Sequence, residues 1–127
     1  MKYNKLLGAY GEDVACSYLE KQGYKILERN FNCKVGELDI VALEGDVLLF
    51  IEVKCRTGVD YGNPADAVSY SKQGKIVKAA LFFMTRYKLF DHMCRFDVIE
   101  VLTDGSKEDT RINLIKNAFE YSGKYGY

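Results

Sequence analysis

Two apolar runs on either side of Gly45-Asp46 constrain the fold of this chain more than any other feature. The runs, Leu38–Glu44 and Val47–Lys54, are rich in Leu, Ile and Val. A Gly-Asp pair between two such runs is typical of the turn of an antiparallel hairpin. Because apolar side chains fall on both pleats of the runs, the pattern predicts two central strands of a sheet.

The segments around this hairpin predict an α/β domain. Apolar residues at helical spacing predict helices over Leu6–Gln22 and Ser71–Tyr87, and short apolar runs predict strands over Tyr24–Phe31 and Cys94–Leu102. The segment Ile112–Phe119 fits a last strand or a short helix. The element order αβββαβ therefore predicts a mixed sheet flanked by helices.

Length and composition exclude several classes of protein. A chain of 127 residues, 48% of them apolar, predicts one domain over residues 1–127. Its 18 basic and 18 acidic residues give a net charge of zero, which excludes a polybasic protein. The longest apolar run, Ala79–Met84, is far shorter than the ~18 residues that a membrane span needs. We therefore expect no membrane contact, and the absence of a signal-peptide pattern favours the cytoplasm.

The cysteines give no sign of a zinc site or a disulfide framework. Cys16, Cys33, Cys55 and Cys94 lie far apart in a chain with a single histidine. Structural zinc sites usually show closely spaced pairs of ligands. We therefore expect four reduced thiols.

A two-residue turn in the hairpin fixes which side chains lie opposite each other. In that register Asp39 faces Glu52, and Glu37 faces Lys54, with all four on one side of the sheet. Facing Cβ atoms are ~5 Å apart, so two carboxylates there repel each other. A hard divalent cation, Mg²⁺ or Mn²⁺, would compensate, because it prefers carboxylate oxygens.

Lys54 lies one pleat beyond Glu52 and could orient a water molecule or stabilise charge on a phosphoryl oxygen. The alternative is a solvated strand face on which Lys54 simply pairs with Glu37. Glu-x-Lys is a short pattern that is common by chance, so it carries little weight alone.

Glu12 and Gln73 extend the candidate site to the two helices. Glu12 shares an apolar stripe with Ala15 and Leu19, and Gln73 shares one with Ile76. A metal, Lys54 or a hydrogen bond at the helix start would each satisfy the Glu12 carboxylate. The start of the second helix could hold a phosphate, or it could be an ordinary solvated first turn.

Charge is unevenly distributed along the chain. Residues 37–53 carry five acidic and no basic residues, whereas residues 54–88 carry seven basic and two acidic ones. This pattern suits a cation site beside an anion-binding surface, although charges can also cluster by chance on solvated faces.

Several motifs in this order resemble the YraN-like family of the restriction-endonuclease-like, PD-(D/E)xK nuclease superfamily. They are Gly8–Ala15 (GAYGEDVA), Arg29-Asn30, Gly36–Ala42 (GELDIVA), Phe50–Arg56 (FIEVKCR), Lys72–Ile76 (KQGKI) and Arg95–Val98 (RFDV). One departure from the superfamily pattern is Leu38, which replaces a proline before the aspartate. The resemblance covers nearly the whole chain and implies a restriction-endonuclease-like core.

The resemblance also implies a set of roles. Asp39 and Glu52, with the Val53 carbonyl, would bind Mg²⁺ or Mn²⁺, and Lys54 would be the catalytic lysine. Accessory active-site residues would be Glu12 and Gln73, and the expected phosphate contacts are Arg56, Lys72 and Lys75.

The function predicted from these residues is metal-dependent hydrolysis of nucleic-acid phosphodiester bonds, with DNA, including branched DNA, as the favoured substrate. A non-catalytic nucleic-acid-binding or repair-scaffold module with the same fold is the alternative. An enzyme acting on a small phosphorylated molecule is less well supported, because the chain has no Gly-rich phosphate loop. A homodimer would double the basic surface of a chain with no net charge, and the sequence leaves that question open.

Overall fold

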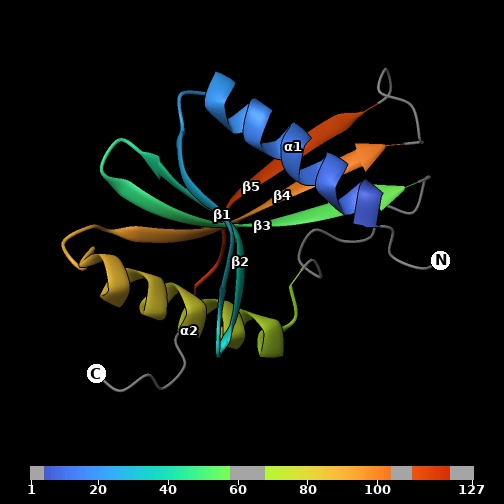
Figure 1. Cartoon of the computed structure of the whole chain (residues 1–127). Coiled ribbons are helices and arrows are strands. Elements are labelled where there is room, and N and C mark those ends of the chain that lie inside the picture. The colour runs from blue at the N-terminus through green and yellow to red at the C-terminus, as the bar shows by residue number, and fades with distance from the viewer. Residues whose placement is uncertain (1–4, 58–67, 104–109, 121–127) are drawn as a thin grey trace.

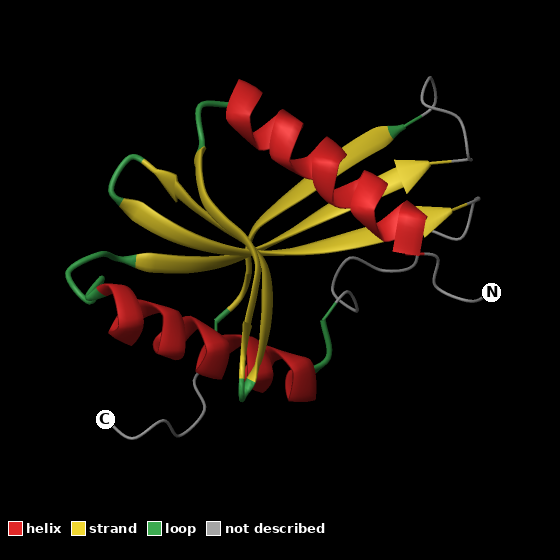
Figure 2. Cartoon of the chain, in the orientation of Figure 1, coloured by secondary structure: helices red, strands yellow, loops and turns green. Residues whose placement is uncertain are grey.

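A computed structural model describes residues 5–57, 68–103 and 110–120 of the chain. These ranges fold as helix, three strands, helix and two strands (Figure 2). The elements are α1 (Lys5–Lys21), β1 (Lys25–Cys33), β2 (Gly36–Glu44), β3 (Val47–Thr57), α2 (Tyr70–Tyr87), β4 (Cys94–Thr103) and β5 (Arg111–Phe119).

The strands form one mixed sheet in the order β1-β2-β3-β4-β5. Neighbouring strands are antiparallel except β3 and β4, which are parallel because α2 carries the chain back across the sheet between them. The predicted α/β fold, with core order αβββαβ, is confirmed, and it is consistent with a restriction-endonuclease-like core. The segment for which a strand and a short helix were both open is a strand, paired with β4.

The two helices cover opposite faces of the sheet (Figure 1). On one face α1 buries Ala15 and Leu19 against a cluster of aliphatic side chains that includes Ile51. On the other face α2 buries Ile76, Phe83 and their neighbours against a second cluster. Each helix presents one apolar stripe, so the sheet is apolar on both sides and its central strands read as continuous apolar runs.

A glycine allows α1 to approach β3 closely. A Cβ atom at Gly11 would lie 3.2 Å from Cys55 Sγ and 3.3 Å from Cys55 Cβ, which is tighter than an ordinary packing contact. The residue after Gly11 is Glu12, one of the predicted site residues. The close approach therefore brings the start of α1, and Glu12 with it, next to the end of β3.

The predicted hairpin register is confirmed up to Ile40 and Ile51, but the predicted facing pairs Asp39–Glu52 and Glu37–Lys54 lie beyond the end of the ladder. The paired residues run from Glu44 opposite Val47 to Ile40 opposite Ile51. Beyond that pair the two strands separate, and we call this point the fork. The first part of β2 pairs with β1, whereas β3 continues along β4 from Glu52 to Thr57. Figure 1 shows the divergence, with β1 and β2 running toward α2 and β3 to β5 running beneath α1.

The second helix begins at a defined cap. The Ser69 side chain accepts a hydrogen bond from the Lys72 backbone N–H at 3.2 Å, and Lys88 closes the other end in the left-handed conformation. Such a cap satisfies one of the N–H groups left free in the first turn of a helix. The same bond places Lys72 in the first turn of α2. Neither helix in the described ranges is long and apolar enough to span a membrane.

Candidate active site at the fork

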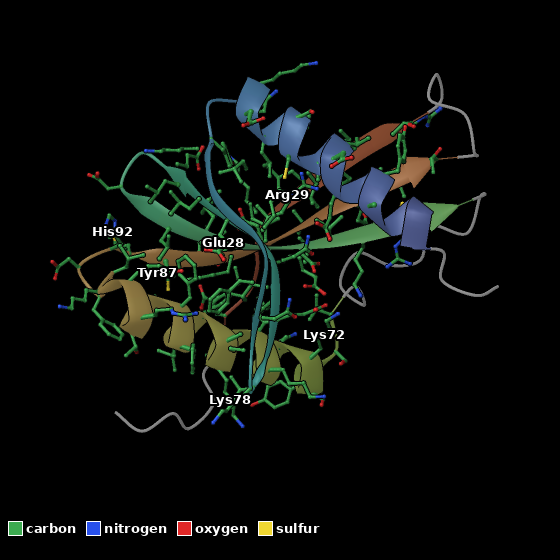
Figure 3. All side chains as sticks on the ribbon, in the orientation of Figure 1. Glu28, Arg29, Lys72, Lys78, Tyr87 and His92 are labelled. Carbon is green, nitrogen blue, oxygen red and sulfur yellow. The ribbon has the colours of Figure 1, made fainter. Side chains whose placement is uncertain are left out.

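A cavity of about 440 Å³ opens at the fork. It is lined by residues of β2, β3 and α2: Glu37, Asp39, Glu52, Val53, Lys54, Cys55 and Lys72. The four residues that the hairpin register places on one face therefore do line a single cavity. Lys72 joins them from the first turn of the helix that follows (Figure 3).

Asp39 lies where the β2–β3 ladder stops. Its carboxylate Oδ2 accepts a hydrogen bond from the Val53 backbone N–H at 2.9 Å. A side-chain oxygen thus replaces the backbone carbonyl that a continuing ladder would supply. The Val53 N–H therefore keeps an acceptor although the two strands separate here. The same bond holds the Asp39 carboxylate against the Val53 peptide.

Asp39 and Glu52 form a buried pair of like charges. Burial is the main cause that raises the pKa of Asp39, and the adjacent Glu52 raises it further, to about 7, against the opposing hydrogen bond from Val53. Glu52 itself is only 6% exposed. Two carboxylates in such a place cannot both be ionised without a compensating positive charge.

Lys72 supplies a positive charge to Glu52. Its Nζ lies 2.5 Å from Glu52 Oε2, in an ion pair between a half-exposed lysine and a buried carboxylate. Burial disfavours the charge on Lys72, but the bond to Glu52 and the surrounding carboxylates outweigh burial and raise the pKa of Lys72. The sequence predicted Lys72 as a phosphate contact, whereas in this structure its ammonium group pairs with Glu52.

Lys54 is the second cation that lines the cavity. Burial lowers its pKa, and the nearby Lys72 lowers it further, against the attraction of Glu52 and Asp39. No described residue forms an ion pair with Lys54, so the alternative in which it pairs with Glu37 is not what the structure shows. A partly buried lysine with a lowered pKa releases or shares a proton more readily than a solvated one.

Glu12 approaches the site from the other face of the sheet. Burial raises its pKa, and Asp39 raises it further, which shows that the two carboxylates feel each other's charge. Arg29 on β1, beneath α1 in Figure 3, partly neutralises it, with Nη2 3.6 Å from Glu12 and 2.8 Å from Asp13. A surface arginine, rather than Lys54, thus partners Glu12.

The remaining predicted residues do not line the cavity. Gln73 donates its side-chain amide to the Val68 carbonyl at 3.1 Å. Lys75 is exposed, on the part of α2 whose backbone packs against Gly36. Arg56 lies two residues beyond Lys54 and forms an ion pair with Glu100, with a distance of 3.1 Å from Nε to Oε2.

Glu100 is a charged residue that the sequence patterns did not single out. It lies in the apolar run of β4 and is 2% exposed. A signal was present, because an isolated Glu within Val98–Val101 breaks a run that otherwise predicts a strand buried on both faces. The partner could not be read from the sequence, since it depends on the parallel pairing of β3 with β4.

The donor groups at the fork suit a hard divalent cation. Two carboxylates converge there, with the Val53 peptide beside them. Burial and the adjacent Glu52 raise the pKa of Asp39 and so favour its protonated form, which a bound cation would oppose. Carboxylate and carbonyl oxygens are what Mg²⁺ and Mn²⁺ prefer, with water completing the shell. Among the described residues no group of three or more His, Cys, Asp or Glu side chains lies at metal-binding distance. Any ion would therefore rely on two side chains, a backbone carbonyl and water.

Comparison with known proteins places the chain in a family. Residues 11–101 match a family described as Uncharacterised protein family UPF0102. A UPF0102 protein of Clostridium kluyveri is 52% identical over 118 residues, which cover 93% of this chain and 97% of the relative. UPF0102 proteins of Clostridium perfringens and Caldicellulosiruptor saccharolyticus are each 47% identical, over 93% and 89% of this chain and 97% and 96% of their own lengths. The matched residues include the whole lining of the fork cavity. The chain therefore belongs to the UPF0102 family.

Proposed function

We propose that this protein is a metal-dependent endonuclease that hydrolyses nucleic-acid phosphodiester bonds, with DNA as the favoured substrate. The observation that carries the proposal is the meeting of Asp39, Glu52 and Lys54 in one cavity at the fork. A buried pair of carboxylates is costly in the absence of a cation, and a lysine beside the pair is suited to a phosphoryl oxygen or a water molecule. The motifs that resemble the PD-(D/E)xK superfamily support the same assignment.

Each residue has a distinct role in this proposal. Asp39, Glu52 and the Val53 carbonyl would hold Mg²⁺ or Mn²⁺, which when bound supplies a Lewis acid for the phosphoryl group. Lys54 would orient the attacking water, or stabilise the charge that develops on the phosphoryl oxygens. The pKa of Lys54, lowered by burial and by the nearby Lys72, makes its ammonium group a readier proton donor than a solvated lysine.

Residues around the cavity would bind the rest of the nucleic-acid strand. Arg56, Lys72 and Lys75, on β3 and α2, would contact phosphates, and Glu12 and Gln73 would support the site from the two helices. The proposal includes action in the cytoplasm. It also allows a homodimer, since a chain with no net charge binds a polyanion weakly by general electrostatics.

One contact favours the alternative of a non-catalytic nucleic-acid-binding module. Lys72 already neutralises Glu52, which is how a fold that has lost its metal could stabilise the same carboxylate. Such a module would bind nucleic acid through Lys54, Arg56 and their neighbours without cleaving it.

The deciding experiment compares cleavage with binding. Wild type is incubated with Mg²⁺ or Mn²⁺ and a panel of duplex, flap and four-way-junction DNA, and the products are resolved on denaturing gels. Lys54→Ala should lose cleavage by roughly 10²-fold or more, while its DNA affinity falls only modestly. Lys54→Arg should not restore cleavage, because a planar guanidinium replaces a compact ammonium. If no variant, wild type included, cleaves any substrate and affinity simply follows total charge, the protein is a binding module.

A further inference from the structure

Glu100 on β4 is a buried carboxylate with both oxygens occupied. Oε2 accepts from Arg56 Nε at 3.1 Å, and Oε1 accepts from Asn113 Nδ2 at 3.0 Å. The Glu100 side chain is 3% exposed. A carboxylate so buried is stable only with such partners, and a buried ion pair seldom stabilises a fold more than apolar residues of the same size would. Stability alone is thus a weak reason for Glu100.

The strand register places this cluster beside the fork. Glu100 is the direct partner of Lys54 across the parallel β3–β4 pair, and Asn113 is its partner across the antiparallel β4–β5 pair. Arg56 follows Lys54 by two residues, so the two side chains leave β3 on the same face, roughly 6.6 Å apart along the strand. The cluster thus continues the row of residues that begins with Glu52.

Glu100 holds one edge of the Arg56 guanidinium. Nε faces Glu100, and in the described ranges no acceptor contacts the two terminal nitrogens. The Arg56 side chain is 26% exposed, so part of it reaches solvent, and it lies two residues beyond Lys54, which lines the cavity. A guanidinium held in this way is well suited to an anion with two oxygens, because a planar pair of N–H donors matches a phosphate.

We propose that Glu100, supported by Asn113, is a positioning residue that aims the Arg56 guanidinium at a phosphate of the bound strand next to the one that reacts. This inference rests on the proposed function, because the phosphate belongs to the nucleic acid bound at the fork. Arg56 makes the contact, and Glu100 acts through Arg56 without touching the nucleic acid.

Positioning and simple electrostatics predict effects of opposite sign. Glu100→Gln removes a negative charge from a surface that faces a polyanion, so simple electrostatics predicts tighter DNA binding. If Glu100 instead holds Arg56 in place, Glu100→Gln leaves one neutral acceptor for two donors, Arg56 and Asn113, so the guanidinium is held less firmly and binding weakens. The substitution keeps the size of the side chain and leaves Asn113 a polar neighbour.

The experiment measures binding without cleavage. Fluorescein-labelled duplex DNA and a labelled four-way junction are titrated with wild type, Arg56→Gln, Glu100→Gln and the double variant, with divalent metal removed by EDTA and salt varied. Arg56→Gln should weaken binding by about tenfold and lower the slope of log affinity against log salt by about one unit. Glu100→Gln should weaken binding in the same direction, with the same smaller slope. The double variant should bind no worse than Arg56→Gln, because Glu100 acts only through Arg56.

Two further variants separate positioning from folding. Glu44→Gln removes a carboxylate that also pairs with an arginine, Arg95, but away from the cavity, and it should bind as wild type or slightly more tightly. Arg56→Lys keeps the charge of Arg56 and needs no change at Glu100, yet it should lose most of what Arg56→Gln loses. It tests the same geometry if Glu100→Gln fails to fold in thermal melting.

The outcomes distinguish this inference from the proposed function. The positioning role is overturned if wild type binds DNA and Glu100→Gln binds it as tightly or more tightly. It is also overturned if Arg56→Lys keeps full affinity. Either result leaves the proposed function intact. If wild type binds neither probe and cleaves none of the panel, the proposed function is wrong and this inference with it.

Discussion

Asp39 is the residue at which the fold and the candidate chemistry conflict most. Its carboxylate completes the backbone bonding of β3 through Val53, yet it lies beside Glu52 with little solvent around it. An amide oxygen could accept the same N–H bond without carrying charge. Without a metal, the ionised carboxylate therefore costs stability that an asparagine would not.

Asp39→Asn should stabilise the metal-free protein at alkaline pH. The pKa of Asp39 is raised to about 7 in the folded state, above the roughly 3.9 of an unfolded chain. The folded protein therefore holds a proton that the unfolded chain has lost, and its stability falls as pH rises from about 4 through 7. In EDTA, Asp39→Asn should match wild type near pH 4 and gain on the order of 2 kcal/mol at pH 8, measured by urea denaturation.

The same variant should lose the response to metal. Mn²⁺ should raise the melting temperature of wild type, because a ligand of the native state stabilises it by mass action. Asp39→Asn should show no such rise. Glu37→Gln, on the exposed rim of the cavity, serves as the matched control and should keep the rise. An equal response in wild type and Asp39→Asn would mean that the ion binds elsewhere.

Lys72→Met should increase the affinity for Mn²⁺. The Lys72 ammonium group pairs with Glu52, so a metal that binds Glu52 must first displace it. Because Lys72 is half exposed and screened by water, the gain should be modest, about threefold to tenfold by calorimetry. Lys75→Met removes a lysine from the same helix that has no contact with Glu52, and it should leave the metal affinity unchanged. A lower affinity in Lys72→Met would show that Lys72 supports the metal site instead of competing for it.

The sequence could place some of these residues and not others. The hairpin register depends only on a two-residue turn, and counting along the strands predicts that Asp39, Glu52 and Lys54 share one face. The ladder itself ends at Ile40 and Ile51, and the three residues meet in the cavity beyond it. Lys72 and Glu100 lie on other elements, and their contacts depend on a crossover and a parallel register that local spacing does not set. The chemical roles of all these residues remain predictions.

At the scale of elements, the sequence predicts the ends of the helices and strands to within about three residues, because helix and strand patterns and their stop signals are local. The helices begin at Lys5 and Tyr70, one residue before their predicted starts. Strand β1 runs to Cys33, two residues past its predicted end, because it pairs with the start of β2 after that strand leaves β3. That extension is a consequence of the fork, which no local pattern describes.

The cap of α2 should matter both for stability and for the site. Ser69→Ala removes the acceptor of the Lys72 N–H and should destabilise the protein by about 1 kcal/mol. Ser69→Asp keeps an acceptor and should retain most of the stability. Ser71→Ala alters an exposed serine two residues later and should change stability by less than about 0.5 kcal/mol. Urea denaturation of the three variants measures these differences.

The cap prediction has a second readout at the fork. If Ser69 fixes the position of Lys72, Ser69→Ala should also raise the Mn²⁺ affinity slightly, in the direction expected for Lys72→Met. A loss of stability with unchanged metal affinity would mean that the first turn of α2 is held by its packing on the sheet and not by its cap.

At the scale of the whole molecule, the site depends on two halves of one sheet that share only the β2–β3 ladder. Strand β2 leaves toward β1, while β3 is held by β4, and β4 by β5. The parallel β3–β4 pair is the longest of these ladders and carries Glu52 and Lys54 on β3. Whatever fixes β4 against β5 therefore also supports the wall of the cavity.

Asp97 is a second side chain, besides Glu100, that links β4 to β5. Its side chain is fully buried, where the pairing of the two strands shifts register. Both oxygens accept from Arg95 at 2.9 Å, and Oδ1 also accepts from the Asn117 backbone N–H at 2.8 Å. Asn117 has a positive φ of 52°, so this bond holds a turn of the backbone that asparagine tolerates better than most residues. The cluster stabilises the irregular part of the pairing.

Asp97→Ala should therefore be among the most destabilising single substitutions in this chain. It leaves the Arg95 guanidinium and the Asn117 N–H without their buried acceptor, at a cost of roughly 3–5 kcal/mol. That is a large part of the ~5–15 kcal/mol that stabilises a typical domain, so urea denaturation should show a midpoint far below that of wild type.

Two variants serve as controls. Asp97→Asn keeps an acceptor for Asn117 and should lose less stability than Asp97→Ala. Asp91→Ala, at an exposed position, should lose less than about 0.5 kcal/mol. Where Asp97→Asn is folded it should still gain stability from Mn²⁺, because Asp97 is not part of the cavity lining. A small loss in Asp97→Ala would show that the remaining contacts suffice to hold β4 against β5. A lost Mn²⁺ response in folded Asp97→Asn would show that the geometry of the fork depends on this carboxylate.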